Sequence, residues 1–185
     1  MNWNIDNAHS TVEFSVRHMM ISTVRGRFER FTGIVDFNES DPTASSVDVQ
    51  IEATSINTNE PQRDNHLRSA DFFEADKYPY ISFKSQKVEK LDDSTGRIFG
   101  DLTIRGITRP VVLETEYNGQ AKSPWGKISA GFSASTKINR KDWNLVWNQG
   151  LETGGVLVGD EIKIRIELEI VKSVPEVAQV EVMNN

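Results

Sequence analysis

Alternation of apolar and charged residues with a period of two is the feature that most constrains the fold of this chain. In the segment EIKIRIELEI, residues 161–170, every second residue from Ile162 to Ile170 is apolar, and every residue between them is charged. A helix would scatter these side chains around its surface, whereas a strand places successive side chains on opposite faces. The segment is therefore predicted to be a β-strand with one buried and one solvent-facing side.

The same alternation recurs along the chain. It is clear in TVEFSVR at residues 11–17, VDVQIEA at 47–53 and KISAGFSASTKI at 127–138. Further strand candidates cover residues 24–37, 80–88, 97–105 and 111–117. About eight strands are predicted in all, which makes the chain an all-β protein.

The connections between the predicted strands are short and contain Gly or Pro. RGITRP, residues 105–110, and NGQAKSPWG, residues 118–126, are each predicted to turn one strand into the next. Such connections are typical of neighbouring antiparallel strands. Within residues 24–37, Phe28 and Phe31 are separated by an odd step, so a bulge near Arg30 is predicted to keep both side chains on one face.

Two segments break the strand pattern. The first runs from Pro61 to Pro79, where a short helix is predicted with Thr58 or Asn59 as N-cap. Its Leu67 and Ala70 are expected to face inward, and Asp64 is expected to pair with Arg68 on the helix surface. The second, residues 139–155, is predicted to be a long loop. Many antiparallel strands can form a sandwich or a closed barrel, and the alternation alone does not choose between them.

Composition narrows the classes of partner and chemistry. The chain has 21 Lys and Arg against 27 Asp and Glu, a net charge of −6, and no block of like charges, so no nucleic-acid partner is expected. It has no cysteine and hence no thiolate chemistry. The first residues, MNWNIDNAHS, lack the pattern of a secretory signal, and no segment approaches ~18 apolar residues. A cytoplasmic protein without stable membrane insertion is expected, although a mature chain that has lost its leader would look the same.

Six sequence blocks resemble one known family. They are WNIDNAHSTVEFSVRHM, GRFERFTGIVDF, SIN, RDNHLRSADFFEADKYPYISFKS, GDLTIRGITRPVVLE and INRKDW, which lie between Trp3 and Trp143. Their content and order are similar to those of the YceI-like family of lipocalin-like, polyisoprenoid-binding proteins, and the likeness extends to about Ile170. The resemblance implies a single lipocalin-like barrel, here residues 1–172, that holds a long apolar chain such as a polyisoprenoid or a fatty-acid-derived lipid. Residues 173–185 are then a C-terminal tail outside the family pattern.

If the strands close into a barrel, alternation assigns the residues that would contact such a ligand. Twelve apolar residues would face inward: Phe14, Val16, Phe28, Phe37, Ile81, Phe83, Leu102, Ile104, Leu113, Phe132, Ile164 and Ile166. Ala130 and Ala134 are small inward residues that would leave space along one wall. Polar or aromatic residues are expected to orient a head group at the mouth: His18, Arg140, Trp143 and Trp147.

Chemical functions are the alternatives to simple binding. His9, His18 and His66 are the three histidines, but the strand between the first two should separate them by roughly 30 Å, so no shared metal is predicted. Asp64, His66 and Asp71 could support acid–base catalysis, and an enzyme that acts on a lipid through His66 or His18 is the second hypothesis. A filled barrel that works through protein contacts is the third. No cofactor is predicted, and exposed sheet edges or apolar patches could support a homodimer.

Overall fold

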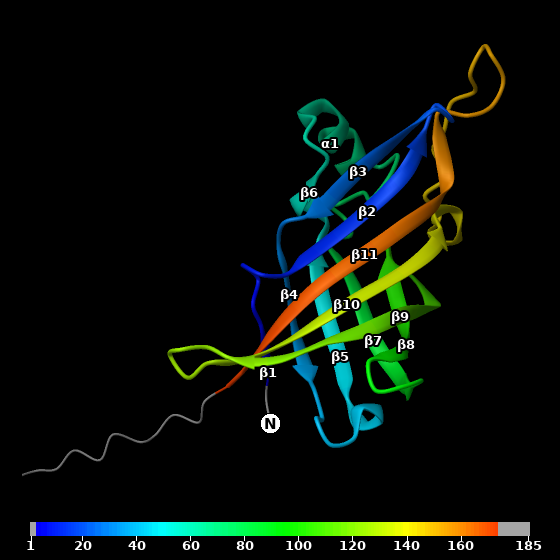
Figure 1. Cartoon of the computed structure of the whole chain (residues 1–185). Helices are drawn as coiled ribbons and strands as arrows, with labels where there is room; N and C mark the ends of the chain where they lie inside the picture. The colour runs from blue at the N-terminus through cyan, green and yellow to red at the C-terminus, as the bar shows by residue number, and fades with distance from the viewer. Residues whose placement is uncertain (1–2, 174–185) are drawn as a thin grey trace, which may run out of the picture.

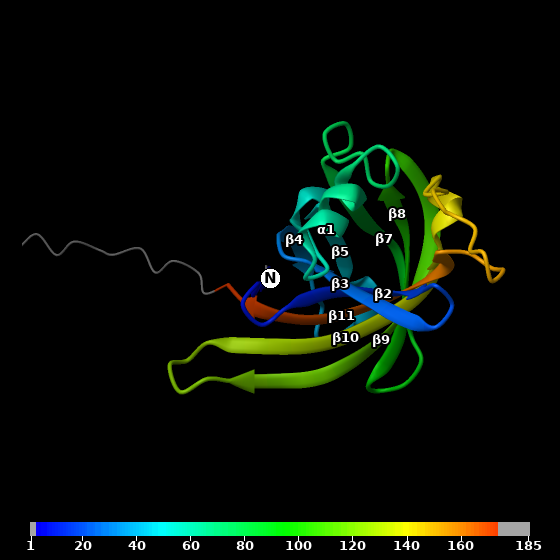
Figure 2. The same ribbon diagram turned by 90° about the horizontal axis from the view of Figure 1, so that it is seen from above.

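The computed structural model describes residues 3–173, which form antiparallel strands wrapped into a barrel (Figures 1 and 2). The predicted tail, residues 173–185, lies outside this range except for Ser173. The elements, in chain order, are β1 Trp3–Ile5, β2 Thr11–His18, β3 Ser22–Phe28, β4 Phe31–Asp36, η1 Pro42–Ala44, β5 Ser46–Glu52, η2 Ala53–Ser55, β6 Ile56–Asn57, α1 Pro61–Arg68, β7 Tyr80–Lys90, β8 Thr95–Ile104, β9 Ile107–Lys122, β10 Ile128–Asn139, η3 Arg140–Trp143 and β11 Val158–Lys172.

The barrel closes because β11 has neighbours on both of its edges. One edge pairs with β10, while the other pairs with β2 over residues 158–167 and with β1 over residues 170–172. Strand β1 in turn pairs with β4, so β1 and β2 behave as one interrupted strand, and β3 and β4 as another. The ring therefore has eight positions and closes on itself, which confirms the predicted barrel and rules out the sandwich.

The predicted strands match the observed ones, with two differences at their ends. The predicted strand 24–37 is divided between β3 and β4 at Glu29 and Arg30, and this interruption leaves Phe28 and Phe31 both buried, as the predicted bulge required. The predicted turn 118–126 is too long, because β9 continues to Lys122 while paired with β10. The β9–β10 hairpin consequently extends beyond the neighbouring strands (Figure 2).

The helix α1 forms where it was predicted, but its cap and its contacts differ. Glu60 is the N-cap and accepts hydrogen bonds from the backbone N–H groups of residues 62 and 63, in place of Thr58 or Asn59. Leu67 packs against the core, whereas Ala70 is exposed. No helix in the described part of the chain combines the length and the apolarity needed to cross a bilayer.

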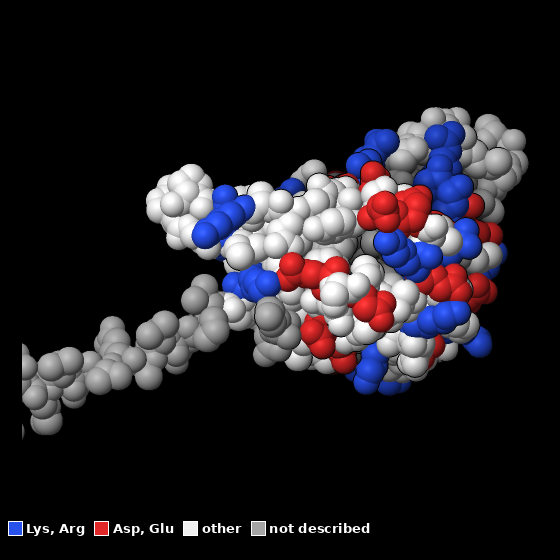
Figure 3. Space-filling model, turned by 60° about the horizontal axis from the view of Figure 1, so that its bottom comes forward, with Lys and Arg blue, Asp and Glu red and all other residues white. Residues whose placement is uncertain are grey.

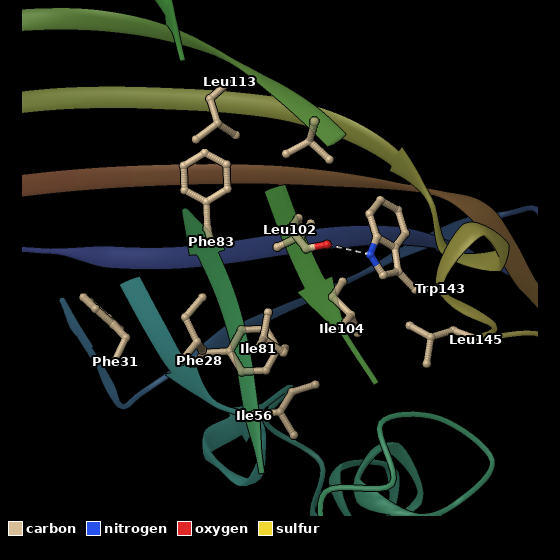
Figure 4. Close-up of a cluster of buried hydrophobic side chains, with 12 residues drawn as sticks. Phe28, Phe31, Ile56, Ile81, Phe83, Leu102, Ile104, Leu113, Trp143 and Leu145 are labelled. Carbon is tan, nitrogen blue, oxygen red and sulfur yellow. Dashed lines mark hydrogen bonds between the residues drawn. The ribbon is translucent and has the colours of Figure 1, made fainter. Parts of the chain in front are cut away.

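The end of the barrel beside α1 is filled with apolar side chains (Figure 4). Trp143, on η3, is 2% exposed, and its indole N–H donates to the carbonyl oxygen of Leu102 on β8 at 3.0 Å. Leu145 and Ile56 are buried in the same cluster. Because a buried indole needs a partner for its N–H, this hydrogen bond fixes the ring where it blocks the end of the barrel.

Arg140 fastens the loop that follows η3. Its guanidinium is 2% exposed and donates to the carbonyl oxygens of Leu145, Trp147 and Gly159, and it lies 3.5 Å from the Asp160 carboxylate. Burial lowers the pKa of Arg140, and Asp160 opposes that shift. These bonds join the two ends of the long predicted loop, so that the loop covers the closed end of the barrel.

Replacing Arg140 by Ala should destabilise the protein by about 3–5 kcal/mol, because it leaves several carbonyl groups without their donor and removes the buried cation beside the Asp160 carboxylate. The control is Lys141→Ala, which removes a half-exposed cation 3.1 Å from the same carboxylate and should cost about 1 kcal/mol or less. Urea unfolding of both variants measures the difference. Equal losses would show that Arg140 acts only as one more surface charge.

Candidate functional site

The barrel encloses a cavity of about 570 Å³, which lies within the range of about 300–1,000 Å³ that is typical of small-molecule sites. Its wall is mainly apolar because the inward positions of the strands are the apolar positions of the alternating pattern. Phe83 and Phe14 each lie over a glycine of a neighbouring strand, Gly100 and Gly26. These close approaches let bulky rings lie flat against the wall instead of filling the centre of the barrel.

The sequence predicts sixteen residues in the ligand site, namely the twelve inward apolar residues, Ala130, Ala134, His18 and Trp143. The structure brings twelve of these sixteen to the wall of this one cavity. They are Phe14, Phe28, Phe37, Ile81, Phe83, Leu102, Ile104, Leu113, Phe132, Ala134, Ile164 and Ile166. Their contact with a ligand stays a prediction.

The other four predicted residues are not part of the cavity wall. Val16 and His18 belong to the part of β2 that extends past the cavity toward the β2–β3 turn. Ala130 is 1% exposed and packs in a separate cluster with Trp3 and Ile170. Trp143 belongs to the closed end. Alternation predicts the correct face for Val16 and Ala130 but not their position along the barrel axis.

The mouth lies at the opposite end from the one predicted. The expected mouth residues Arg140, Trp143 and Trp147 belong to the closed end near α1, where Trp147 packs on His66 and Phe72. The exposed residues of the cavity wall come instead from the β4–β5 connection and the β7–β8 hairpin, at the bottom of Figure 1. The polar residues at this mouth are Glu39, Ser40, Glu89, Lys90, Asp92, Asp93, Ser94, Arg97 and Gln120.

Asp92 organises one side of the mouth. Its carboxylate accepts hydrogen bonds from the hydroxyl and the N–H of Thr95, each at 2.7 Å, and from the N–H of Ser94 at 2.8 Å. These bonds, the Thr95 hydroxyl first, lower the pKa of Asp92 to about 2. The carboxylate is therefore ionised at any physiological pH, and the turn of the β7–β8 hairpin carries a fixed negative charge.

An aromatic group forms the wall below the other side of the mouth. The rings of Phe37, Tyr117 and Phe132 have centroids 5.1–5.8 Å apart. Burial, with a further contribution from the Glu39 carboxylate, raises the pKa of Tyr117. Glu39 itself binds the Lys172 ammonium at 2.6 Å, and this bond lowers its pKa. The Tyr117 hydroxyl therefore stays neutral at physiological pH, and the residue is part of the cavity wall.

The residues on which the enzymatic alternative depends lie outside the cavity. His66 Nε2 is 2.8 Å from the Asp71 carboxylate, so the pair forms, but neither residue is part of the cavity wall. Asp64 is buried and accepts hydrogen bonds from the hydroxyl and the N–H of Thr58 at 2.6 and 2.9 Å. The predicted pairing of Asp64 with Arg68 is wrong, because Arg68 donates to backbone carbonyl groups and to an Asn side chain.

One cluster in the described residues has the composition of a cation site. The side chains of Asp6, His9 and Glu169 approach within 4.8 Å of one another. The Asp6 carboxylate also binds the Lys127 ammonium at 3.1 Å, and this bond is the main cause of its lowered pKa. Because an ammonium group already supplies the positive charge, the cluster is explained as an ion-pair network. His9 precedes β2 and His18 ends it, so the strand separates them as the spacing predicted.

Comparison with known proteins identifies the family. The YceI-like domain model matches residues 3–170. A UPF0312 protein of Staphylococcus aureus is 38% identical over 169 residues, covering 91% of this chain and 96% of the relative.

Two solved structures share the fold. The YCEI protein of Campylobacter jejuni superposes with a TM-score of 0.74 at 36% identity, covering 85% of this chain and 90% of that one. A polyisoprenoid binding domain from Saccharophagus degradans superposes with a TM-score of 0.66 at 13% identity, covering 92% of this chain and 98% of that one. The match along nearly the whole chain, together with the eight-position barrel, shows that this protein belongs to the YceI-like family.

Proposed function

We propose that this protein binds a long-chain apolar lipid, a polyisoprenoid or a fatty-acid-derived chain, inside the barrel for carriage, storage or sequestration. The observation that supports this most directly is the enclosed cavity of about 570 Å³ with an apolar wall and a polar mouth. The related domain from Saccharophagus degradans is described as polyisoprenoid binding. A polyisoprenoid is accordingly the first ligand to test.

The energetics of burial favour an apolar chain. Removing one methylene from water is worth about 0.8 kcal/mol, so one five-carbon isoprene unit contributes on the order of 3–4 kcal/mol. Association costs up to ~15 kcal/mol, and micromolar binding needs about 8 kcal/mol net. By this arithmetic about six to eight buried units are needed for micromolar binding without a charged anchor. A short apolar molecule would fall below the threshold.

The mouth favours a neutral head group. Its carboxylates, Glu39, Glu89, Asp92 and Asp93, outnumber its cations, Lys90 and Arg97. Both cations are already paired, Lys90 with Asp93 at 3.0 Å and Arg97 with Glu114 at 2.9 Å. Glu39 and Glu89 are paired in turn with Lys172 and Lys87, each at 2.6 Å, so within residues 3–173 Asp92 is the mouth carboxylate that has no cationic partner. A phosphate head group would therefore meet the negative charge of Asp92, whereas a hydroxyl or carbonyl group could hydrogen-bond Tyr117 or Gln120.

Catalysis at the bound lipid has less support. A general acid or base must lie within hydrogen-bond reach of the reacting atom, directly or through one water molecule. His66 and His18, the residues on which the enzymatic hypothesis depends, both lie outside the cavity wall. The binding function requires neither of them.

Substituting Ala134, on the cavity wall, by Phe should reduce the lipid bound by at least tenfold, at a folding cost of about 1–3 kcal/mol. The control is Ala121→Phe, because Ala121 is exposed on the projecting β9–β10 hairpin. Decaprenol retained after gel filtration, extracted and measured by mass spectrometry, gives the bound amount. Unchanged decaprenol in folded Ala134→Phe would contradict binding at this wall. Ala130 is unsuitable for this test because it packs in the separate cluster.

A polyisoprenol should bind several-fold more tightly than the polyisoprenyl phosphate of the same chain length, because the phosphate approaches the ionised Asp92 carboxylate, which has no cationic partner within residues 3–173. The difference should shrink as salt is added, since screening weakens the repulsion between exposed charges. Competition between the two lipids at low and high ionic strength measures it. Tighter binding of the phosphate at low salt would overturn the assignment of head-group preference, while leaving binding of the apolar chain intact.

A further inference from the structure

The outer face of the barrel carries a concentration of positive charge that is invisible in the linear sequence. A hollow across β3, β2, β11, β10 and β9 is lined by five exposed cations and two carboxylates, Glu13 and Glu114. The cations are Arg25, Arg27, Lys137, Lys163 and Arg165. In Figure 3, Lys and Arg side chains lie among Asp and Glu side chains across the right half of the view. The hollow has three more cations than carboxylates, whereas the whole chain has a net charge of −6.

One cross-strand row in this hollow contains cations without a carboxylate. Arg25 lies opposite Ser15, which lies opposite Lys163, which lies opposite Lys137. Like charges directly opposite each other destabilise a sheet. Lys137 lies 3.9 Å from the Glu161 carboxylate, whereas within residues 3–173 neither Arg25 nor Lys163 forms an ion pair. The fold therefore carries an electrostatic cost that an external anion would relieve.

The β2–β3 hairpin, which carries Ser15 and Arg25, ends in an exposed apolar turn. Met19, Met20 and Ile21 are 41%, 60% and 78% exposed. Met19 and Met20 have φ values of 51° and 62°, and the N–H of Ile21 donates to the carbonyl oxygen of His18 at 3.2 Å. Positive φ at two successive turn positions favours Asn and Gly, so two methionines here are strained as well as exposed. These three residues therefore do not contribute to folding stability in the way that Asn and Gly would at the same positions.

A further cation, Arg17, lies between the apolar turn and the cationic hollow on the outer face of the barrel. Arg17 is exposed on the outer side of β2, and its guanidinium donates to the carbonyl oxygen of Met20 at 3.1 Å. The carboxylate of Asp160, at the start of β11, is held by Arg140 and Lys141 at 3.5 and 3.1 Å. Positive charge thus continues from the hollow to the apolar turn.

We propose that the outer face of the β2–β3 hairpin docks on a membrane surface that contains anionic phospholipids, with Met19, Met20 and Ile21 in the interfacial layer and Arg17, Arg25 and Lys163 facing the phosphates. Peripheral membrane binding typically combines these two elements, a small apolar insertion and cations that contact anionic head groups. An acidic protein or a nucleic acid would match the charge but would offer no apolar layer for the turn. The proposal does not depend on what the cavity holds.

The full chain should co-sediment with phosphatidylcholine vesicles that contain phosphatidylglycerol, and should bind much less to pure phosphatidylcholine vesicles. Binding should fall as salt is raised. Neutralising one contacting cation, by Lys163→Gln or Arg25→Gln, should lower vesicle partitioning about fivefold. The control is Lys84→Gln, which makes the same change in net charge on the exposed side of β7 and should change partitioning less than twofold.

Changing the turn separates its proposed role from a structural one. The double variant Met19→Asn, Met20→Gly fits the backbone better and should raise the melting temperature while weakening vesicle binding. A parallel loss of stability and binding would contradict the proposal, as would vesicle binding equal to that of the unchanged protein.

Two further results would overturn the proposal. One is absence of binding to anionic vesicles at low salt, and the other is an equal loss in Lys163→Gln and Lys84→Gln. Decaprenol retention by the same variants provides a separate readout. Loss of vesicle binding with full decaprenol retention is the expected pattern, because the basic face and the cavity are different surfaces.

Discussion

The rest of the structure depends on how β11 divides its hydrogen bonds. This strand pairs with β10 on one edge and with both β2 and β1 on the other, and so closes the ring. Closure satisfies the backbone groups that an open sheet would expose. It also gives every strand one face toward the barrel interior and one face toward solvent. The apolar cavity and the cationic outer face both follow from this one arrangement.

The alternation in residues 161–170 predicted both faces of β11 correctly. Inward Ile164 and Ile166 are part of the cavity wall, and outward Lys163 and Arg165 line the hollow on the outer face. The barrel itself required the family resemblance, because alternation is the same in a sandwich. The cationic face could not be read from the chain, since its members are separated in sequence and are brought together only by strand register.

The mouth was predicted at the wrong end for a related reason. Trp143 and Arg140 look like ligand-binding residues in a long loop, but the indole hydrogen bond to Leu102 and the guanidinium contacts to the loop carbonyls make them a plug. The true mouth contains Asp92, in a polar turn that carries the ordinary signature of a hairpin. Local periodicity predicts which face of the sheet a side chain occupies. Its position along the barrel axis depends on how the strands are staggered, which local sequence does not encode.

Methyl NMR of the protein on addition of decaprenol shows whether the barrel encloses the apolar chain. If it does, the inward methyl groups of Ile81, Leu102 and Leu113 should show contacts with the lipid and large changes in chemical shift. The methyl groups of Ile34 and Val112, which are 70% and 36% exposed, should be unchanged. Changes confined to Ile34, Val112 or other exposed methyl groups, or no change at any lipid concentration, would contradict enclosure of the lipid.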